Sequence, residues 1–203
     1  KINMMSYWVV GCLTALAGFL VALAAALEER PRTVKLDATV PTLVVLGSGG
    51  HTTEMLQLTS RLDSRRYSPV TFVVAASDST SRAKADSMPR ALKPTNWATI
   101  SRAREVGQGW LSSTLTTARA GAEAVALLIR LRPGLVIANG PGTCVPICIL
   151  ARLLGARVVF CESWCRVQTL SLSGRILYRI AHRFVVHWPD LVRRYPKAEY
   201  IGR

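Results

Sequence analysis

The stretch TLVVLGSGGHTTEML, residues 42–56, is the strongest indication of the fold class of this chain. Its apolar run 43–46 indicates a buried strand, and the residues after the glycines indicate a helix. Gly47, Gly49 and Gly50 permit positive φ angles and close backbone approach, so the amides that open the helix can point at an anion. The stretch therefore predicts a strand, a ligand-facing turn and a helix, which is the unit of an α/β fold.

The same alternation continues along the chain. Strands are expected at 43–46, 70–75, 98–101, 135–138, 158–161, 184–187 and 199–201, with helices at 51–62, 79–87, 109–131, 143–154 and 172–181. Parallel strands need helical crossovers, so the pattern predicts a Rossmann-like parallel sheet with helices on both faces. In the usual doubly wound order, strands one and four border the ligand crevice and strand five lies next to four. The turns GSGGHT, NGPGTCVP and CESWCRV would then converge.

The first part of the chain is apolar. Residues 2–27 contain no charge, and roughly 20 apolar residues cross a bilayer as a helix. We interpret 1–27 as a transmembrane anchor, 28–41 as a linker and 42–203 as the folded domain; a cleaved secretory signal is the alternative. Arg30, Arg32 and Lys35 follow the span while Lys1 alone precedes it, which places the domain in the cytosol by the positive-inside rule.

Charge and cysteine content narrow the class of protein. The net charge is +14, which suits either nucleic acid or an anionic membrane surface, and for an anchored protein the membrane is the simpler explanation. Arg175, Arg179 and Arg183 recur every fourth residue, as in a helix lying on a membrane or in the solvated face of a core helix. The five cysteines form no disulfide framework and no zinc pattern, so we expect core packing and no metal site.

His51 follows the glycine turn directly. A P-loop needs Gly-Lys-Ser/Thr and a dinucleotide fingerprint needs glycine in place of Thr52, so neither motif is present. At a helix N-terminus the dipole favours neutral imidazole, which can accept a proton. His51 is therefore a candidate general base, and a histidine that merely caps the helix is the alternative. Thr52 and Thr53 are candidate capping residues, with Glu54 in the first turn.

Two further turns carry polar residues at strand ends. In NGPGTCVP, Asn139, Gly140 and Gly142 form a tight turn, with Thr143 as expected N-cap and a proline in the first helical turn. Glu162 follows the apolar run VVFC, where a buried carboxylate requires a partner. Arg166 is the nearest candidate. The pair is equally consistent with a structural ion pair and with a ligand site.

A fourth stretch, SRAREVGQGWLSS, follows the third strand. It places Arg102, Arg104 and Glu105 in a loop at the ligand-facing edge, and loops at this edge commonly recognise polar substrates. The arginines suit an anionic substrate. The chain has no Asp-x-Asp pair, which argues against a transferase that holds a nucleotide sugar through a divalent metal.

Taken together, these residues resemble the membrane-anchoring subunit of the UDP-N-acetylglucosamine transferase of asparagine-linked glycosylation. The resemblance rests on the apolar N-terminus and on LGSGGHTTEML, SRAREVGQ, NGPGTCVP, ES followed by RV, LSLSG and WPDLVRRYPKAEYIG, in that order. It implies the acceptor-binding half of a B-type glycosyltransferase, similar to the bacterial transferase that makes lipid II. A separate cytosolic subunit would bind most of the UDP-sugar, with no further cofactor.

The resemblance also implies a reaction and a place. The complex would add a second N-acetylglucosamine, β-1,4 and with inversion, to dolichyl-diphosphate-N-acetylglucosamine at the cytosolic face of the endoplasmic reticulum, with no nucleic acid involved. His51 or Glu162 would deprotonate the acceptor hydroxyl. The remaining site residues would hold acceptor, diphosphate or donor phosphates: Gly47, Ser48, Gly49, Gly50, Thr52, Arg102, Arg104, Glu105, Asn139, Gly140, Gly142, Thr143 and Arg166. A scaffold without chemistry and a membrane-tethered reductase are the rival classes.

Overall fold

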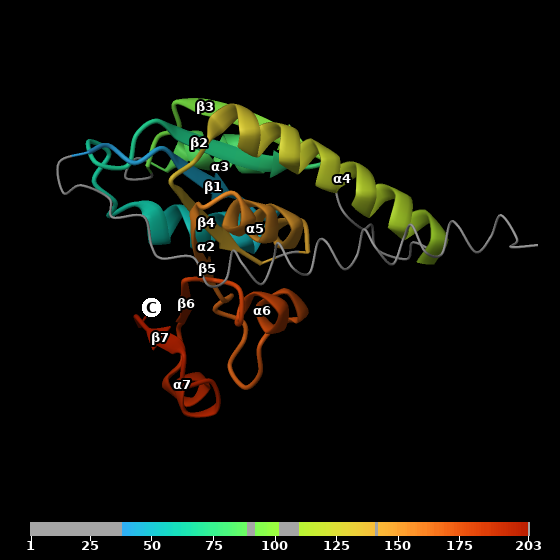
Figure 1. Ribbon diagram of the computed structural model, residues 1–203. Coiled ribbons are helices and arrows are strands. Elements are labelled where there is room, and N and C mark those ends of the chain that lie inside the picture. Colours follow the sequence, from blue (N-terminus) through green and yellow to red (C-terminus); the bar gives the residue numbers. More distant parts are fainter. Residues whose placement is uncertain (1–37, 89–91, 102–109, 141, 203) are drawn as a thin grey trace, which may run out of the picture.

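The computed structural model describes residues 38–88, 92–101, 110–140 and 142–202, with only the backbone for 110–120 (Figure 1). The predicted anchor, 1–27, and residues 28–37 of the linker lie outside these residues. Among the helices that the structure does describe, none combines the length and the apolar character that a bilayer span requires.

The described residues form a seven-stranded sheet in the order β3-β2-β1-β4-β5-β6-β7, with every neighbouring pair parallel. The predicted neighbours, strand one beside four and four beside five, are confirmed. In register, Val45 lies opposite Ala138 and Ala138 opposite Phe160. The carboxyl ends of β1, β4 and β5 therefore reach the same edge of the sheet. The strands are β1 Thr42–Val45, β2 Val70–Ala75, β3 Asn96–Ile100, β4 Leu135–Asn139, β5 Arg157–Cys161, β6 Arg183–Val186 and β7 Ala198–Tyr200.

Helices cover both faces of the sheet, as predicted (Figure 1). Successive strand residues point to opposite faces, so Leu43 and Val45 enter one core and Val44 the other. The first core is completed by residues of α4, α5, α6 and α7, the second by residues of α2 and α3. The helices are α2 Gly50–Thr59, α3 Ser81–Ser87, α4 Trp110–Leu131, α5 Cys144–Leu153, α6 Leu172–Leu177 and α7 Pro189–Arg194.

The C-terminal elements depart most from the prediction. The helix α6 ends at Leu177 instead of position 181, and Arg183 lies on β6, where its Nε donates to Glu199 at 2.9 Å. The regular arginine spacing therefore does not belong to one helix. The short helix α7 was not predicted, although it has proline at its first position and Asp190 in its first turn.

The expectation that cysteines pack in the core is confirmed for Cys144, Cys148 and Cys161, which are all buried. Burial, with a smaller contribution from the charge of Glu54, raises the pKa of the Cys161 thiol to about 12. This thiol therefore stays neutral and acts as a small apolar side chain. Cys165, in contrast, is exposed.

His182 makes the stability of this fold depend on pH. Its Nδ1 accepts a hydrogen bond from the Val158 amide at 2.9 Å. Burial, followed by the charges of Arg152 and Arg157, lowers its pKa from 6.5 to about 4. The unfolded chain therefore binds a proton between these values that the folded chain does not, so stability falls as pH falls from 6.5 to about 4.

We expect the His182→Asn variant, whose amide oxygen can still accept from Val158, to lose this dependence. Because the ring is partly solvated, the difference between wild type and variant should be on the order of 1 kcal/mol, or about 2–4 °C in thermal midpoint. Thermal unfolding of both chains at about pH 7 and about pH 4.5 measures it. Parallel losses in the two chains would contradict the assignment to His182.

Candidate functional site

The turn after β1 is shaped by backbone conformation and by one buried threonine. Gly49 occupies the N-cap of α2 with φ 69°, a conformation that favours glycine, and no side chain caps the helix. Thr52 is fully buried, and its hydroxyl donates to the Gly47 carbonyl and contacts Ser81 Oγ. The prediction that Thr52 or Thr53 caps α2 is thus wrong, because no side chain caps this helix and the Thr52 hydroxyl instead joins the turn to α3. Glu54, predicted in the first turn, lies beyond it. Ser48, Gly49 and Gly50 remain exposed.

Glu54 brings the three predicted turns together. This carboxylate on α2 is only 6% exposed. Its Oε2 accepts from Asn139 Nδ2 at the end of β4, and its Oε1 accepts from Ser163 Oγ just after β5, both at 2.9 Å. The convergence of the turns after β1, β4 and β5 is therefore confirmed. This role of Glu54 was not predicted, because its partners lie 85 and 109 residues away in the sequence.

His51 lies against the same carboxylate. Its Nδ1 is 3.7 Å from Glu54 Oε2, and this nitrogen is buried without a hydrogen-bond partner among the described residues. The side chain as a whole is 36% exposed, so other atoms of the side chain reach solvent while Nδ1 does not. A small rotation would let Nδ1–H donate to Glu54, leaving Nε2 as the nitrogen that can face a ligand.

Gly140 provides the surface on which the imidazole packs. Its φ is 82°, and a Cβ placed there would lie 2.7 Å from both Cγ and Nδ1 of His51. Any side chain at this position would therefore displace the ring.

We expect Gly140→Ala to lower the activity that depends on His51 by about 10- to 100-fold, because a displacement near 1 Å has effects of this size. The control is Gly121→Ala on α4, since a Cβ at Gly121 would meet no atom within 4 Å and this residue is outside the predicted site. Equal activity of the two variants would show that the position of the ring is unimportant.

Glu162 is fully buried, as predicted, but its partners are serines. Its oxygens accept from the Ser163 amide at 3.0 Å, the Ser171 amide at 2.9 Å and the Ser171 hydroxyl at 3.1 Å. Ser171 in turn caps α6 by accepting from the Gly174 amide. Arg166 is exposed, and the described ion pairs do not include one between it and Glu162. The expected Arg166–Glu162 pair is thus replaced by neutral hydrogen-bond donors.

The remaining predicted residues are placed as follows. Asn139 is fully buried, and its Oδ1 lacks a partner among the described residues. Thr143 is the N-cap residue of α5, as predicted, although its side chain makes no capping bond. Arg102, Arg104 and Glu105 lie outside the described residues. The residue before them, Ser101, is fixed at the end of β3 by Glu123, through its amide at 2.7 Å and its hydroxyl at 2.9 Å.

A family model described as "Oligosaccharide biosynthesis protein Alg14 like" matches residues 42–203 of this chain. The chain belongs to this Alg14-like family. The match covers the whole described sheet and all three turns that Glu54 joins, so the candidate site lies inside the family domain.

Curated relatives agree with this assignment. Over 79% of its length the chain is 46% identical to "UDP-N-acetylglucosamine transferase subunit ALG14" of Mus musculus and 47% identical to the protein of the same name of Homo sapiens, covering 81% of each relative. Among solved structures, the fold is similar to that of Acinetobacter baumannii MurG, with a TM-score of 0.57 and 18% identity. That similarity covers 74% of this Alg14-like chain and 42% of the MurG chain.

Proposed function

We propose that this chain is the acceptor-binding, membrane-anchoring subunit of a heteromeric UDP-N-acetylglucosamine transferase. The complex would add the second N-acetylglucosamine, β-1,4 and with inversion, to dolichyl-diphosphate-N-acetylglucosamine. The names of the mouse and human relatives support the class of transferase and the role as a subunit. The chain would be anchored in the endoplasmic reticulum membrane by residues 1–27, with its domain facing the cytosol.

One observation carries the chemical part of the proposal: Glu54 fixes the His51 turn to Asn139 and Ser163 while the imidazole stays partly exposed. A general base must be oriented by a neighbour and must still reach its substrate. Nδ1 facing a buried carboxylate selects the tautomer whose Nε2 can accept a proton. Glu54 is therefore a positioning residue for His51.

The proposed reaction is a direct displacement. His51 Nε2 removes the proton from the acceptor 4-hydroxyl while that oxygen bonds to the anomeric carbon of the donor. The bond between this carbon and the UDP oxygen breaks, and UDP leaves with the electron pair. Glu54 stabilises the imidazolium that results. The turn 47–50, of which Ser48, Gly49 and Gly50 are exposed, precedes the N-terminus of α2, where phosphate oxygens can bind.

Glu162 is the weaker candidate for the base. It is fully buried, and both of its oxygens accept hydrogen bonds that hold the loop before α6. A carboxylate in this position stabilises local structure and lacks access to a sugar hydroxyl. Its burial supports His51 as the base and leaves to Glu162 the task of fixing α6.

The second half of the site is assigned to a separate cytosolic subunit. Ligands of parallel α/β sheets bind beyond the carboxyl ends of the strands, and the similarity of this chain to MurG covers 42% of the MurG chain. The remaining part of the site, with most contacts to the UDP-sugar, would come from the partner. On this basis we expect the chain to be inactive alone and to need no cofactor beyond the donor substrate.

A three-way transfer assay tests the proposal. UDP-N-acetylglucosamine and lipid-linked acceptor are incubated with this chain, with the partner subunit, and with both. We expect product only from the mixture. Activity of the partner alone on a soluble acceptor would support a scaffold role, and binding of NAD by the purified chain would favour a reductase.

A further inference from the structure

The helix α6 has an outward face that the core does not use. Its inward side consists of Ser173, Gly174 and Leu177, all buried. On the other side, Leu172 is 74% exposed and Ile176, one turn later, is 41% exposed. Two large aliphatic side chains at this spacing form an apolar ridge on the surface.

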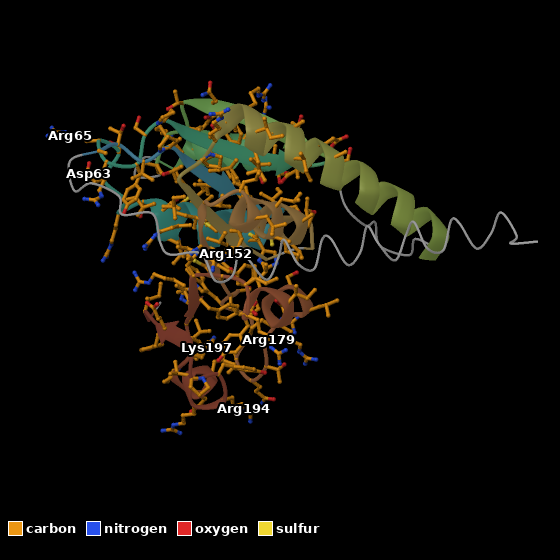
Figure 2. The ribbon with its side chains drawn as sticks, viewed as in Figure 1. Asp63, Arg65, Arg152, Arg179, Arg194 and Lys197 are labelled. Carbon is orange, nitrogen blue, oxygen red and sulfur yellow. The ribbon has the colours of Figure 1, made fainter. Side chains whose placement is uncertain are left out.

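Arginines flank this ridge. Arg175 and Arg179 are exposed and have the same four-residue spacing as Leu172 and Ile176, and Figure 2 shows Arg179 beside α6. The sequence from 163 to 182 contains no aspartate or glutamate. The segment of α6 and the turn after it therefore presents exposed aliphatic side chains beside arginines, with no acidic residue of its own.

The N-terminus of α6 lies at the edge of the sheet where the carboxyl ends of the strands meet. The helix follows the loop that leaves the carboxyl end of β5, and Glu162 at that end fixes its N-terminus through Ser171. In Figure 1, α6 lies on the side toward which the N-terminal end of α4 projects.

The chemistry of the face fits a lipid surface better than a protein. Protein hot spots are enriched in aromatic side chains that fill matching pockets, whereas this ridge is aliphatic and convex. Leucine and isoleucine can enter the acyl boundary while arginines extend to the phosphate groups. We propose that the surface formed by Leu172, Arg175 and Ile176 of α6 and by Arg179, two residues after the end of this helix, binds the surface of an anionic lipid bilayer.

This contact is separate from the N-terminal anchor and would set how the domain lies on the membrane. An anchor alone leaves the domain free to rotate on its linker, whereas a second contact at α6 restricts the domain to orientations that bring the carboxyl edge of the sheet near the headgroups. The proposal goes beyond the proposed function and does not require it, because lipid contact can be measured without transfer.

A fluorescent label at position 172 tests the contact directly. The full chain carrying Cys165→Ser and Leu172→Cys is labelled with NBD and mixed with vesicles of phosphatidylcholine, or of a roughly four-to-one mixture of phosphatidylcholine and phosphatidylserine. The Cys165→Ser chain serves as the blank. Leu154→Cys is the matched position, since Leu154 is 51% exposed at the end of α5. We expect emission to rise and shift to the blue on the anionic vesicles at position 172 and to stay constant at position 154.

The charge requirement is tested in the labelled chain. Arg175→Gln and Arg179→Gln should each weaken the response to anionic vesicles about fivefold, as expected for a basic residue near such a surface. The pair Arg130→Gln and Arg157→Gln removes the same charge from exposed sites elsewhere and should leave the response unchanged.

Three results would each overturn the proposal: no response of the label at position 172, an equal response on neutral vesicles, or a response only after addition of the partner subunit. These readouts stand apart from the transfer assay, so failure of one does not imply failure of the other.

Discussion

His51→Ala should lower the transfer rate of the assembled complex by about 10²- to 10⁴-fold, the range that a general base contributes. The loss is expected because this imidazole is positioned as a base at the surface of the site, with Nδ1 against Glu54 and part of the ring exposed. Initial rates at saturating donor and acceptor measure the effect. Binding of the partner subunit should be unchanged, since the substitution leaves the backbone of α2 intact.

The control is His182→Asn, which removes a different, partly buried histidine near the opposite edge of the sheet. This variant should transfer at the wild-type rate near neutral pH. Full turnover by His51→Ala would end the role of His51 as the base. Loss of partner binding together with activity would instead indicate a structural role for the ring.

Glu54→Gln should lower kcat by about 10²-fold or more, with little change in KM, because a carboxylate that orients a catalytic imidazole acts mainly in the transition state. The substitution keeps the shape of the side chain but offers one oxygen to two donors, Asn139 Nδ2 and Ser163 Oγ. We therefore also expect a loss of about 1–3 kcal/mol in the free energy of unfolding, the usual range for one unsatisfied buried group.

A double-mutant cycle separates these two effects. If Glu54 acts through His51, then Glu54→Gln should reduce transfer very little in a chain that already carries His51→Ala, while its effect on stability should persist. Independent, multiplicative losses of activity would show that Glu54 does not act through the imidazole. Thermal unfolding of all four chains provides the stability comparison.

Much of the fold could be predicted from the sequence because its signals are local. Each buried strand is a short apolar run, and each crossover in a parallel sheet needs a helix. The alternation of short apolar runs with longer segments therefore predicts the order of strands and helices. The helix α7 was missed because six residues are too few for a helical period to emerge. Only its proline and its charged ends mark it.

The turns that form the candidate site could be predicted from the sequence, but the side-chain contacts between them could not. Glycines and strand ends located the edge at which His51, Asn139 and Glu162 occur. The hydrogen bonds among side chains depend on which residues the sheet brings together, and sequence distance is a poor guide to that. Arg166 was expected to pair with Glu162 because it is near in the chain, whereas Ser171, nine residues away, provides the bonds. The role of Glu54 became apparent only in three dimensions.

The bonding of Glu54 to two neighbouring strands has a consequence for protein engineering. The segment from Gly47 to Glu54 is continuous in sequence and could be transferred to another protein as one loop. There, however, the buried carboxylate of Glu54 would lack the hydrogen bonds that the Asn139 amide and the Ser163 hydroxyl donate here. A buried charge without a partner lowers the free energy of unfolding by several kcal/mol. Transplants and chimaeras should therefore exchange the ends of β1, β4 and β5 as one unit, since any one of them moved alone would arrive incomplete.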